Sequence, residues 1–175
     1  MKRCSLICAA IFLISFGAVQ AYRGLASDET KIRRLLLETA MSFNAGSREG
    51  CLAAFHSDYK DDSLVVIGKR RLDRSTLGQA LMYVLHRERD AETSAFRLRV
   101  GFGEGESSAE DLEDWSIAVD GARALAEFNL RFDRWKAGNW EPVWGVSVSA
   151  NLRRDEGLWT VVGSSTETVS GRRPY

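Results

Sequence analysis

Cysteine is scarce in this sequence. Three cysteines occur among 175 residues, and two of them, Cys4 and Cys8, lie in an apolar N-terminal segment. If that segment is removed from the mature protein, Cys51 alone remains, and one cysteine cannot form an internal disulfide bond. The fold is therefore expected to depend on its hydrophobic core for stability.

A run of apolar residues long enough to span a membrane is also lacking. The apolar run Leu6–Val19 is shorter than the ~20 residues that a spanning helix needs. Lys2 and Arg3 precede it, and small or compact residues stand at the positions that signal peptidase reads. This pattern predicts a signal peptide, residues 1–21, that is cleaved after Ala21; an uncleaved anchor is the alternative. Export without disulfide bonds favours a periplasmic or secreted protein with no membrane contact after cleavage.

Neither sign of charge is in excess, because 24 basic residues balance 24 acidic residues. A nucleic-acid-binding domain usually carries a basic excess or a basic stripe. We therefore exclude nucleic acid as a partner.

Motifs for metals, cofactors and common nucleophiles are missing as well. The two histidines, His56 and His86, and one mature cysteine do not make a zinc pattern, and both histidines are expected at helix ends. The sequence has no Gly-x-Ser-x-Gly elbow. Its glycines at 101, 103 and 105 are not followed by a helix, as a phosphate-binding loop requires. We expect no cofactor and no bound metal.

The first pattern that is present is helical. Ser27 is a capping residue, and Asp28 and Glu29 follow it near the positive end of the helix dipole. Asn44-Ala45-Gly46 ends the helix, because Asn and Gly tolerate the left-handed conformation. Between these ends, apolar residues recur at helical spacing: Ile32, Leu35, Leu36, Ala40 and Phe43.

Two further helices are predicted. Ser47 is suited to cap a short helix that buries Leu52 and Phe55. Asp73 or Ser75 would cap a third helix, whose apolar stripe consists of Leu77, Ala80, Leu81, Val84 and Leu85.

Beyond residue 95 the period of the apolar residues becomes two, which is typical of strands. The alternation covers 96–102, 115–119, 124–132 and 144–152, and a last strand is expected over 159–168. Asp120-Gly121 is a strong hairpin signal, and the earlier apolar run Leu64–Ile67 is also consistent with a strand. Helices followed by antiparallel strands indicate an α+β fold with the helices on one face of the sheet. We expect one domain, residues 22–169, and a polar tail, residues 170–175.

The order of these elements resembles the nuclear transport factor 2-like superfamily, which includes ketosteroid isomerase and the SnoaL-like polyketide cyclases. The resemblance covers residues 28–168 and rests on Phe43-Asn44-Ala45-Gly46, on Phe55-His56 followed by Asp58–Asp62, and on a helix that opens near Asp73 before the strands. It implies a cone-shaped fold, in which a curved antiparallel sheet wraps around three N-terminal helices. It also implies an apolar pocket at the open end and a sheet face that is used in dimers.

Asp61 and Asp62 are the candidate catalytic residues. They stand about where ketosteroid isomerase places its base, just after the second helix, and a desolvated carboxylate at an apolar pocket can act as a base. The alternative is a solvated turn or a partner for Lys60 or Arg70. Tyr59 is a candidate ligand-binding residue through its hydroxyl, or else packs its ring at the edge of the cone.

The oxyanion hole of ketosteroid isomerase consists of a tyrosine on the first helix and a protonated aspartic acid on a strand. In this sequence Met41 and Phe43 stand nearest to the position of that tyrosine, and Glu127 and Asp133 fall on the polar side of the strands. These differences favour a non-catalytic domain over an enzyme.

Other candidate ligand-binding residues are His86, beside the apolar stripe of its helix, and three tryptophans that either line a pocket or fill the core: Trp115, Trp144 and Trp159. The polar side of the strands faces either solvent or a second copy of the chain, and consists of Arg97, Arg99, Glu127, Asn129, Arg131, Ser147, Ser149 and Asn151.

Three functions follow, in this order of preference. The first is an exported, non-catalytic domain that binds a small apolar ligand in the cone. The second is a homodimeric or partner-binding envelope module that acts through the sheet face. The third is an isomerase, dehydratase or cyclase that uses Asp61 or Asp62 as its base.

Overall fold

The computed structural model describes residues 26–66, 70–87, 96–100 and 115–172, and within them the side chains outside 62–66, 70–71 and 83–87. The predicted signal peptide, residues 1–21, lies outside the described residues. Among the helices that are described, none combines the length and the hydrophobicity that crossing a membrane requires.

Within the described residues, three helices form where the capping residues predict them: α2 (Asp28–Asn44), α3 (Arg48–Ala53) and α4 (Arg74–Arg87). The side chains of Ser27, Ser47 and Asp73 each accept a hydrogen bond from the backbone N–H three residues further on. Helix α2 ends at Asn44, and Gly46 follows with a φ of 71°, in the left-handed region that glycine adopts at low cost. The predicted helix starts and the first stop are confirmed.

The part of the chain that the structure describes has seven strands: β1 (Phe55–Val66), β2 (Arg70–Asp73), β3 (Phe96–Val100), β4 (Ser116–Asp120), β5 (Arg123–Lys136), β6 (Asn139–Asp155) and β7 (Leu158–Gly171). They form one sheet in the order β2-β1-β7-β6-β5-β3, with β4 paired to another part of β5. Every pairing is antiparallel except that of β1 with β7, which is parallel. The Asp120-Gly121 turn joins β4 to β5 as predicted.

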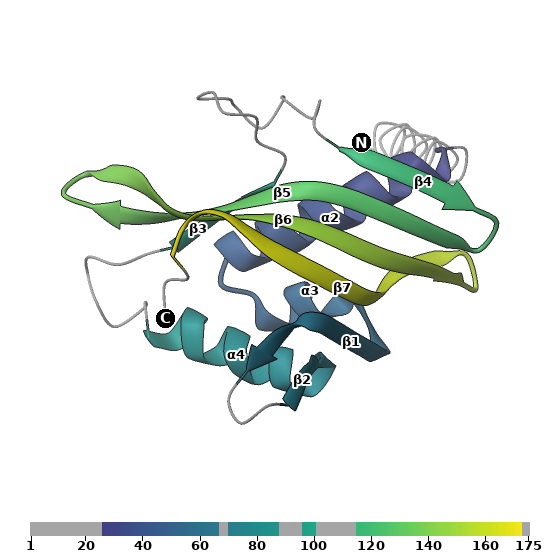
Figure 1. Ribbon diagram of the computed structural model, residues 1–175, viewed down its shortest axis with the longest axis horizontal. Helices are drawn as coiled ribbons and strands as arrows, with labels where there is room; N and C mark the ends of the chain where they lie inside the picture. Colours follow the sequence, from purple (N-terminus) through teal and green to yellow (C-terminus); the bar gives the residue numbers. More distant parts are fainter. Residues whose placement is uncertain (1–25, 67–69, 88–95, 101–114, 173–175) are drawn as a thin grey trace, which may run out of the picture.

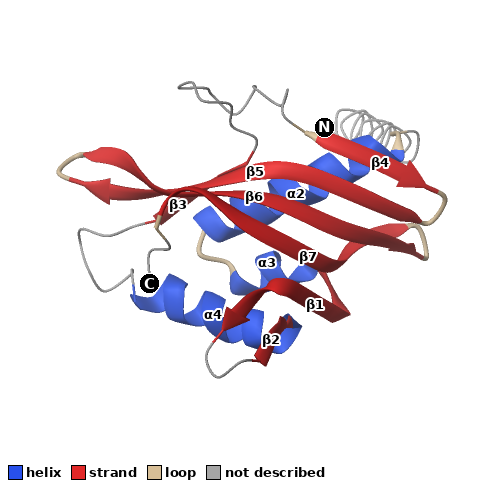
Figure 2. Cartoon of the chain, viewed as in Figure 1, coloured by secondary structure: helices blue, strands red, loops and turns tan. Residues whose placement is uncertain are grey.

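The sheet is curved and the helices lie on one of its faces (Figure 1, Figure 2). Helix α2 crosses behind β5 and β6, and it contacts β3, β4 and β7. We call the face toward the helices the inner face and the opposite one the outer face. The predicted α+β class, with a curved sheet around N-terminal helices, is confirmed.

The core lies between α2 and the inner face. Ile32 and Leu36 of α2 pack into a cluster with Leu152, Trp159 and Val161 of the sheet, and Ile32 is completely buried. Burial of a side chain of this size contributes about 1.5–3 kcal/mol to stability. The apolar residues of the alternations predicted for β5 and β6 face this core, so the alternation identified the inner face of these two strands correctly.

Several strand ends differ from the prediction, among them the start of β1, both ends of β6 and the end of β7. Strand β1 begins at Phe55, so Phe55 and His56 belong to a strand and not to the end of the short helix. Strand β7 continues to Gly171, past the predicted end at residue 168, because Ser170 and Gly171 pair with residues of β6. At the start of β1 and at the end of β7, a neighbouring strand, and not local propensity, extends the element.

Candidate functional site

The alternation of side chains between the two faces of strand β7 is interrupted at Val162. Between Val161 and Gly163 this strand advances two residues while β6 advances one, so Val162 is the additional residue of a β-bulge. A bulge of this kind moves the side chains that follow it to the other face of the strand. Ser164 therefore faces the core, where it is 9% exposed.

Strand β1 brings two polar side chains to the same place. Tyr59 and Asp61 are two residues apart on β1, so they share a face of the strand. The parallel pairing of β1 with β7 sets Asp61 beside Ser164. Tyr59 is 3% exposed and Asp61 is 2% exposed, so this is a buried set of polar side chains. We call Tyr59, Asp61 and Ser164 the inner polar set.

The three side chains of the inner polar set are joined by hydrogen bonds. Ser164 Oγ donates to Asp61 Oδ2 at 2.7 Å. The hydroxyl of Tyr59 lies 2.8 Å from Ser164 Oγ and 3.3 Å from Asp61 Oδ2. Each hydroxyl has one proton to donate in a hydrogen bond. Ser164 donates its hydrogen bond to the carboxylate of Asp61, so Tyr59 is the donor to Ser164 Oγ. The carboxylate is a second, more distant acceptor for the Tyr59 hydroxyl.

The environment keeps Tyr59 protonated. Burial raises the pKa of its phenol far above the ordinary value, because the phenolate would be poorly solvated. The hydrogen bond with Ser164 lowers this pKa, and the charge of Asp61 and the hydrogen bond with it raise it again. At neutral pH the tyrosine is therefore a hydrogen-bond donor and not a base.

The hydroxyl groups continue along β7. After the bulge, Ser164, Thr166 and Thr168 pair with residues of β6 that face the core, so they also lie on the inner side. Thr168 Oγ1 accepts a 3.1 Å hydrogen bond from Nε1 of Trp144. The inner face is thus apolar on β5 and β6 and carries hydroxyl groups along the second half of β7.

The three candidate tryptophans are all buried in the core. Trp115 stacks on Phe128, and Trp144 stacks on Phe132, with ring centroids 5.2 Å and 5.0 Å apart. Trp159 donates from Nε1 to Asp28 at 3.2 Å. The side chains of the candidates Asp62 and His86 lie outside the described residues.

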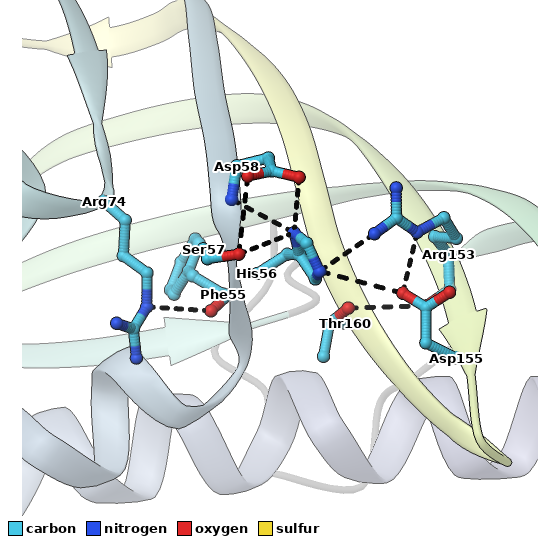
Figure 3. A network of polar contacts seen from close by, with 8 residues as sticks. All are labelled: Phe55, His56, Ser57, Asp58, Arg74, Arg153, Asp155 and Thr160. Atoms are coloured by element: carbon cyan, nitrogen blue, oxygen red, sulfur yellow. Dashed lines mark hydrogen bonds and ion pairs between the residues drawn. The ribbon is translucent and has the colours of Figure 1, made fainter.

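His56 belongs to a second polar network, near the turn between β6 and β7 (Figure 3). Its Nδ1 accepts from the backbone N–H of Asp58 at 3.0 Å, and its Nε2 lies 2.9 Å from a guanidinium nitrogen of Arg153. Asp58 and Asp155 are within 4 Å of the ring, at 3.5 Å and 3.8 Å, and both are well exposed. This network ties β1 to the end of β6 at the surface.

Within the described part of the chain, no group of three or more His, Cys, Asp or Glu side chains is placed to hold a metal ion. Cys51 is buried as a free thiol, and burial raises its pKa to about 11. The inner polar set is therefore the strongest candidate site among these residues. Tyr59 and Asp61 were predicted, whereas Ser164 was not. The sequence held one signal for Ser164, namely Gly163. A glycine inside a strand pattern often marks a bulge, and a bulge at this point turns Ser164 toward the core.

No protein-family model and no curated protein matches the chain, but solved structures do. One is an NTF2-like protein with a cystatin-like fold from Novosphingobium aromaticivorans. It superposes with a TM-score of 0.65 at 15% sequence identity, over 88% of this chain and 90% of its own. This chain has the nuclear transport factor 2-like fold.

Two other solved structures match over similar lengths. A ketosteroid isomerase-like protein from Erwinia carotovora atroseptica has a TM-score of 0.56 at 14% identity, covering 83% of this chain and 99% of its own. The protein Aln2 from a Streptomyces species has a TM-score of 0.61 at 12% identity, covering 82% of this chain and 93% of its own. At these identities the shared property is the fold, which confirms the resemblance predicted from the order of the elements.

Proposed function

We propose that this domain binds a small, largely apolar molecule against the inner face of its sheet, and that the inner polar set anchors one polar group of that molecule. The observation that carries the proposal is the mixed character of this face. A carboxylate and two hydroxyls are buried at one side, while β5 and β6 present apolar side chains at the other. Ligand sites of this kind combine an apolar lining with a few placed polar groups.

The chemistry of the inner polar set defines the polar group that suits it. Asp61 supplies a carboxylate acceptor, Ser164 supplies a hydroxyl that can donate or accept, and Tyr59 stays protonated as a donor. A hydroxyl group on the ligand can replace one of the internal hydrogen bonds without leaving a buried polar atom unpaired. Ser164 is the most exposed of the three, so an incoming ligand is expected to meet it first.

The proposal is tested with the purified protein and a neutral, environment-sensitive dye such as Nile red, displaced by a panel of small phenols and apolar alcohols. We expect saturable displacement by at least one alcohol or phenol. Ser164→Ala and Asp61→Asn should each lower the affinity for that ligand by about tenfold to a hundredfold, because a hydrogen bond to a charged group contributes on the order of 1.5–3 kcal/mol.

Ser165→Ala is the matched control. Ser165 is the next residue of β7, is exposed, and lies on the outer face. Its substitution should leave ligand affinity unchanged. Absence of any saturable ligand, or equal weakening by Ser164→Ala and Ser165→Ala, would remove the basis of the proposal.

A second candidate function is acid–base catalysis by Asp61. The burial of this carboxylate and the two hydroxyls that hold it in place favour it, since a general base must be positioned for the proton that it abstracts. The test is exchange of the α-hydrogen of an enolisable, apolar ketone in deuterium oxide, followed by NMR. Exchange that Asp61→Asn abolishes while ketone binding persists would establish an enzyme. Exchange no faster than in buffer would exclude catalysis, and the binding function would then be the remaining proposal.

A further inference from the structure

Strand β1 is irregular just before it reaches the inner polar set. Between Phe55 and Lys60, β1 advances five residues while β7 advances two. In the pairings of the described strands, residues 56–59 therefore have no opposite residue on β7, and the pairing of β1 with β2 begins only at Lys60. We call residues 56–59 the β1 arch. Its last residue is Tyr59, so the contacts that fix the arch also position the Tyr59 hydroxyl.

Contacts on both sides hold the β1 arch in shape. On the core side, the ring of Phe55, just before the arch, meets the ring of Tyr59 edge to face, with centroids 4.7 Å apart. Arg74 of α4 donates from Nε to the carbonyl oxygen of Phe55 at 2.9 Å (Figure 3). On the surface side, the backbone N–H of Asp58 donates to His56 Nδ1 at 3.0 Å. Since β7 offers the arch no opposite residue, the histidine ring takes the place of a strand neighbour.

The other ring nitrogen of His56 faces the end of β6 (Figure 3). His56 Nε2 lies 2.9 Å from Arg153 Nη2 and 3.8 Å from Asp155 Oδ2. Arg153 Nε donates to the same carboxylate oxygen at 2.7 Å. On the arch itself, Asp58 Oδ2 lies 3.5 Å from His56 Nδ1. Further charged side chains on the neighbouring elements are Lys60 on β1, Arg48 and Glu49 on α3, Arg74 on α4, Arg123 on β5, which pairs with Arg153, and Glu156 after β6.

The neutral and the protonated ring of His56 make different contacts with these neighbours. In a neutral imidazole one nitrogen accepts and the other carries the proton. Because Nδ1 accepts from the N–H of Asp58, Nε2 carries the proton and has Asp155 as its nearest carboxylate. Protonation of Nδ1 ends the bond with that N–H and places a positive ring beside Arg153. Nδ1 then has the carboxylate of Asp58 and Ser57 Oγ, 3.4 Å away, as acceptors within reach.

Histidine side chains exchange their proton between about pH 5 and pH 8, and the side chain of His56 is 22% exposed, so solvent reaches it. We propose that His56 is a positioning residue for Tyr59. The neutral ring holds the β1 arch and the protonated ring releases it, so that the inner polar set binds its ligand more weakly in acid. The effect on the ligand rests on the proposed function, whereas the change in the arch can be tested without a ligand.

NMR titration of the ligand-free protein, labelled with ¹³C and ¹⁵N, tests the change in the arch between about pH 8 and pH 5. We expect the ring of His56 to carry its proton on Nε2 at the upper pH. The amide signal of Asp58 and the ring signals of Tyr59 should shift in one step with the ring of His56. A ring that carries its proton on Nδ1 at the upper pH, or Tyr59 signals that stay constant through the step, would overturn the proposal.

Two variants imitate the two states of the ring. An asparagine side chain accepts from the backbone N–H two residues further on at every pH, so His56→Asn should keep the Asp58 and Tyr59 signals of the neutral form throughout. His56→Ala supplies no acceptor and should show the signals of the acid form throughout, with circular dichroism as the check of its fold. Arg123→Gln is the control and should titrate as the wild type does. Arg123 is exposed and has no contact with His56 in the described part of the chain.

The ligand readout uses the alcohol or phenol that displaces Nile red, at about pH 7.5 and pH 5.5. The affinity of the wild type and of Arg123→Gln should fall by about twofold to tenfold at the lower pH, which is the contribution of one hydrogen bond. His56→Asn should bind equally well at both pH values, and His56→Ala equally weakly. A pH step that persists in His56→Asn would assign it to another group and overturn the proposal. If no ligand saturates the wild type, the proposed function fails, while the NMR titration still decides the role of His56.

Discussion

Ser164 donates a 2.7 Å hydrogen bond to Asp61, although 103 residues separate the two in the sequence. This bond joins the last strand to the first strand inside the core. It exists because β1 and β7 are parallel neighbours and because β7 has a bulge just before Ser164. Its strength can be measured separately from any function.

Ser164→Ala is expected to lower the free energy of unfolding by about 1.5–3 kcal/mol, since it removes a hydrogen bond to a buried carboxylate. Ser165→Ala should change it by about 0.5 kcal/mol or less, because Ser165 is exposed. Urea denaturation of both variants measures the difference. Two variants of equal stability would mean that the bond contributes nothing.

Tyr59 should resist ionisation in the folded protein, because burial raises the pKa of its hydroxyl well above ~10. Alkaline difference spectra measure how many tyrosines ionise. Near pH 10–11 the folded wild type and folded Tyr59→Phe should show the same number, whereas in urea the wild type should show one ionised tyrosine more. The folded state keeps this proton after the unfolded state has lost it, so stability should fall as the pH rises above ~10. A Tyr59 that titrates at its ordinary value in the folded protein would contradict the buried network.

The helices and the facing of β5 and β6 could be predicted because they depend on local rules. Ser27 and Asp73 cap helices through contacts three residues away, and a period of two fixes the facing of Phe128 as long as the strand is regular. Such signals are present in a short window of sequence. They do not depend on which strand becomes the neighbour.

The candidate site could be predicted only in part, for a physical reason. Continued alternation from Val161 would have put Gly163 and Ser165 inside, but the bulge at Val162 reverses the facing and brings in Ser164. Asp133 was predicted on the polar side, which is correct. Three arginines nevertheless bury it, because long side chains on the same face, two from β3 and one from β5 itself, cover the short one. Pairing between distant strands decides both outcomes.

Cys51 should react slowly with iodoacetamide. It is 1% exposed, and burial raises the pKa of its thiol from 9.0 to about 11. At pH 8 this shift reduces the reactive thiolate about a hundredfold relative to the unfolded chain. Mass spectrometry of the peptide that contains Cys51, with and without urea, measures the ratio. The folded state keeps the thiol proton of Cys51 to a higher pH than the unfolded state does, so stability is expected to fall from about pH 9 upward. Equal rates with and without urea would show that the thiol is accessible in the native state.

Asp28 links the start of helix α2 to the end of the sheet, and this link should weaken in acid. The hydrogen bond from Trp159 Nε1 is the largest cause that lowers its pKa below 3.8; burial opposes this shift, while the charges of Arg154 and Lys31 add to it. The unfolded chain therefore takes up this proton first, so the contribution is complete above pH 3.8 and is lost as the pH falls through the lower, folded pKa. Asp28→Asn should be less stable than the wild type at neutral pH and should lose less stability between about pH 5 and pH 3. Asp58→Asn, which changes an exposed carboxylate at the surface, is the comparison variant. If Asp28→Asn and the wild type show the same acid dependence in urea denaturation, the contact of Asp28 with Trp159 does not hold the helix to the sheet.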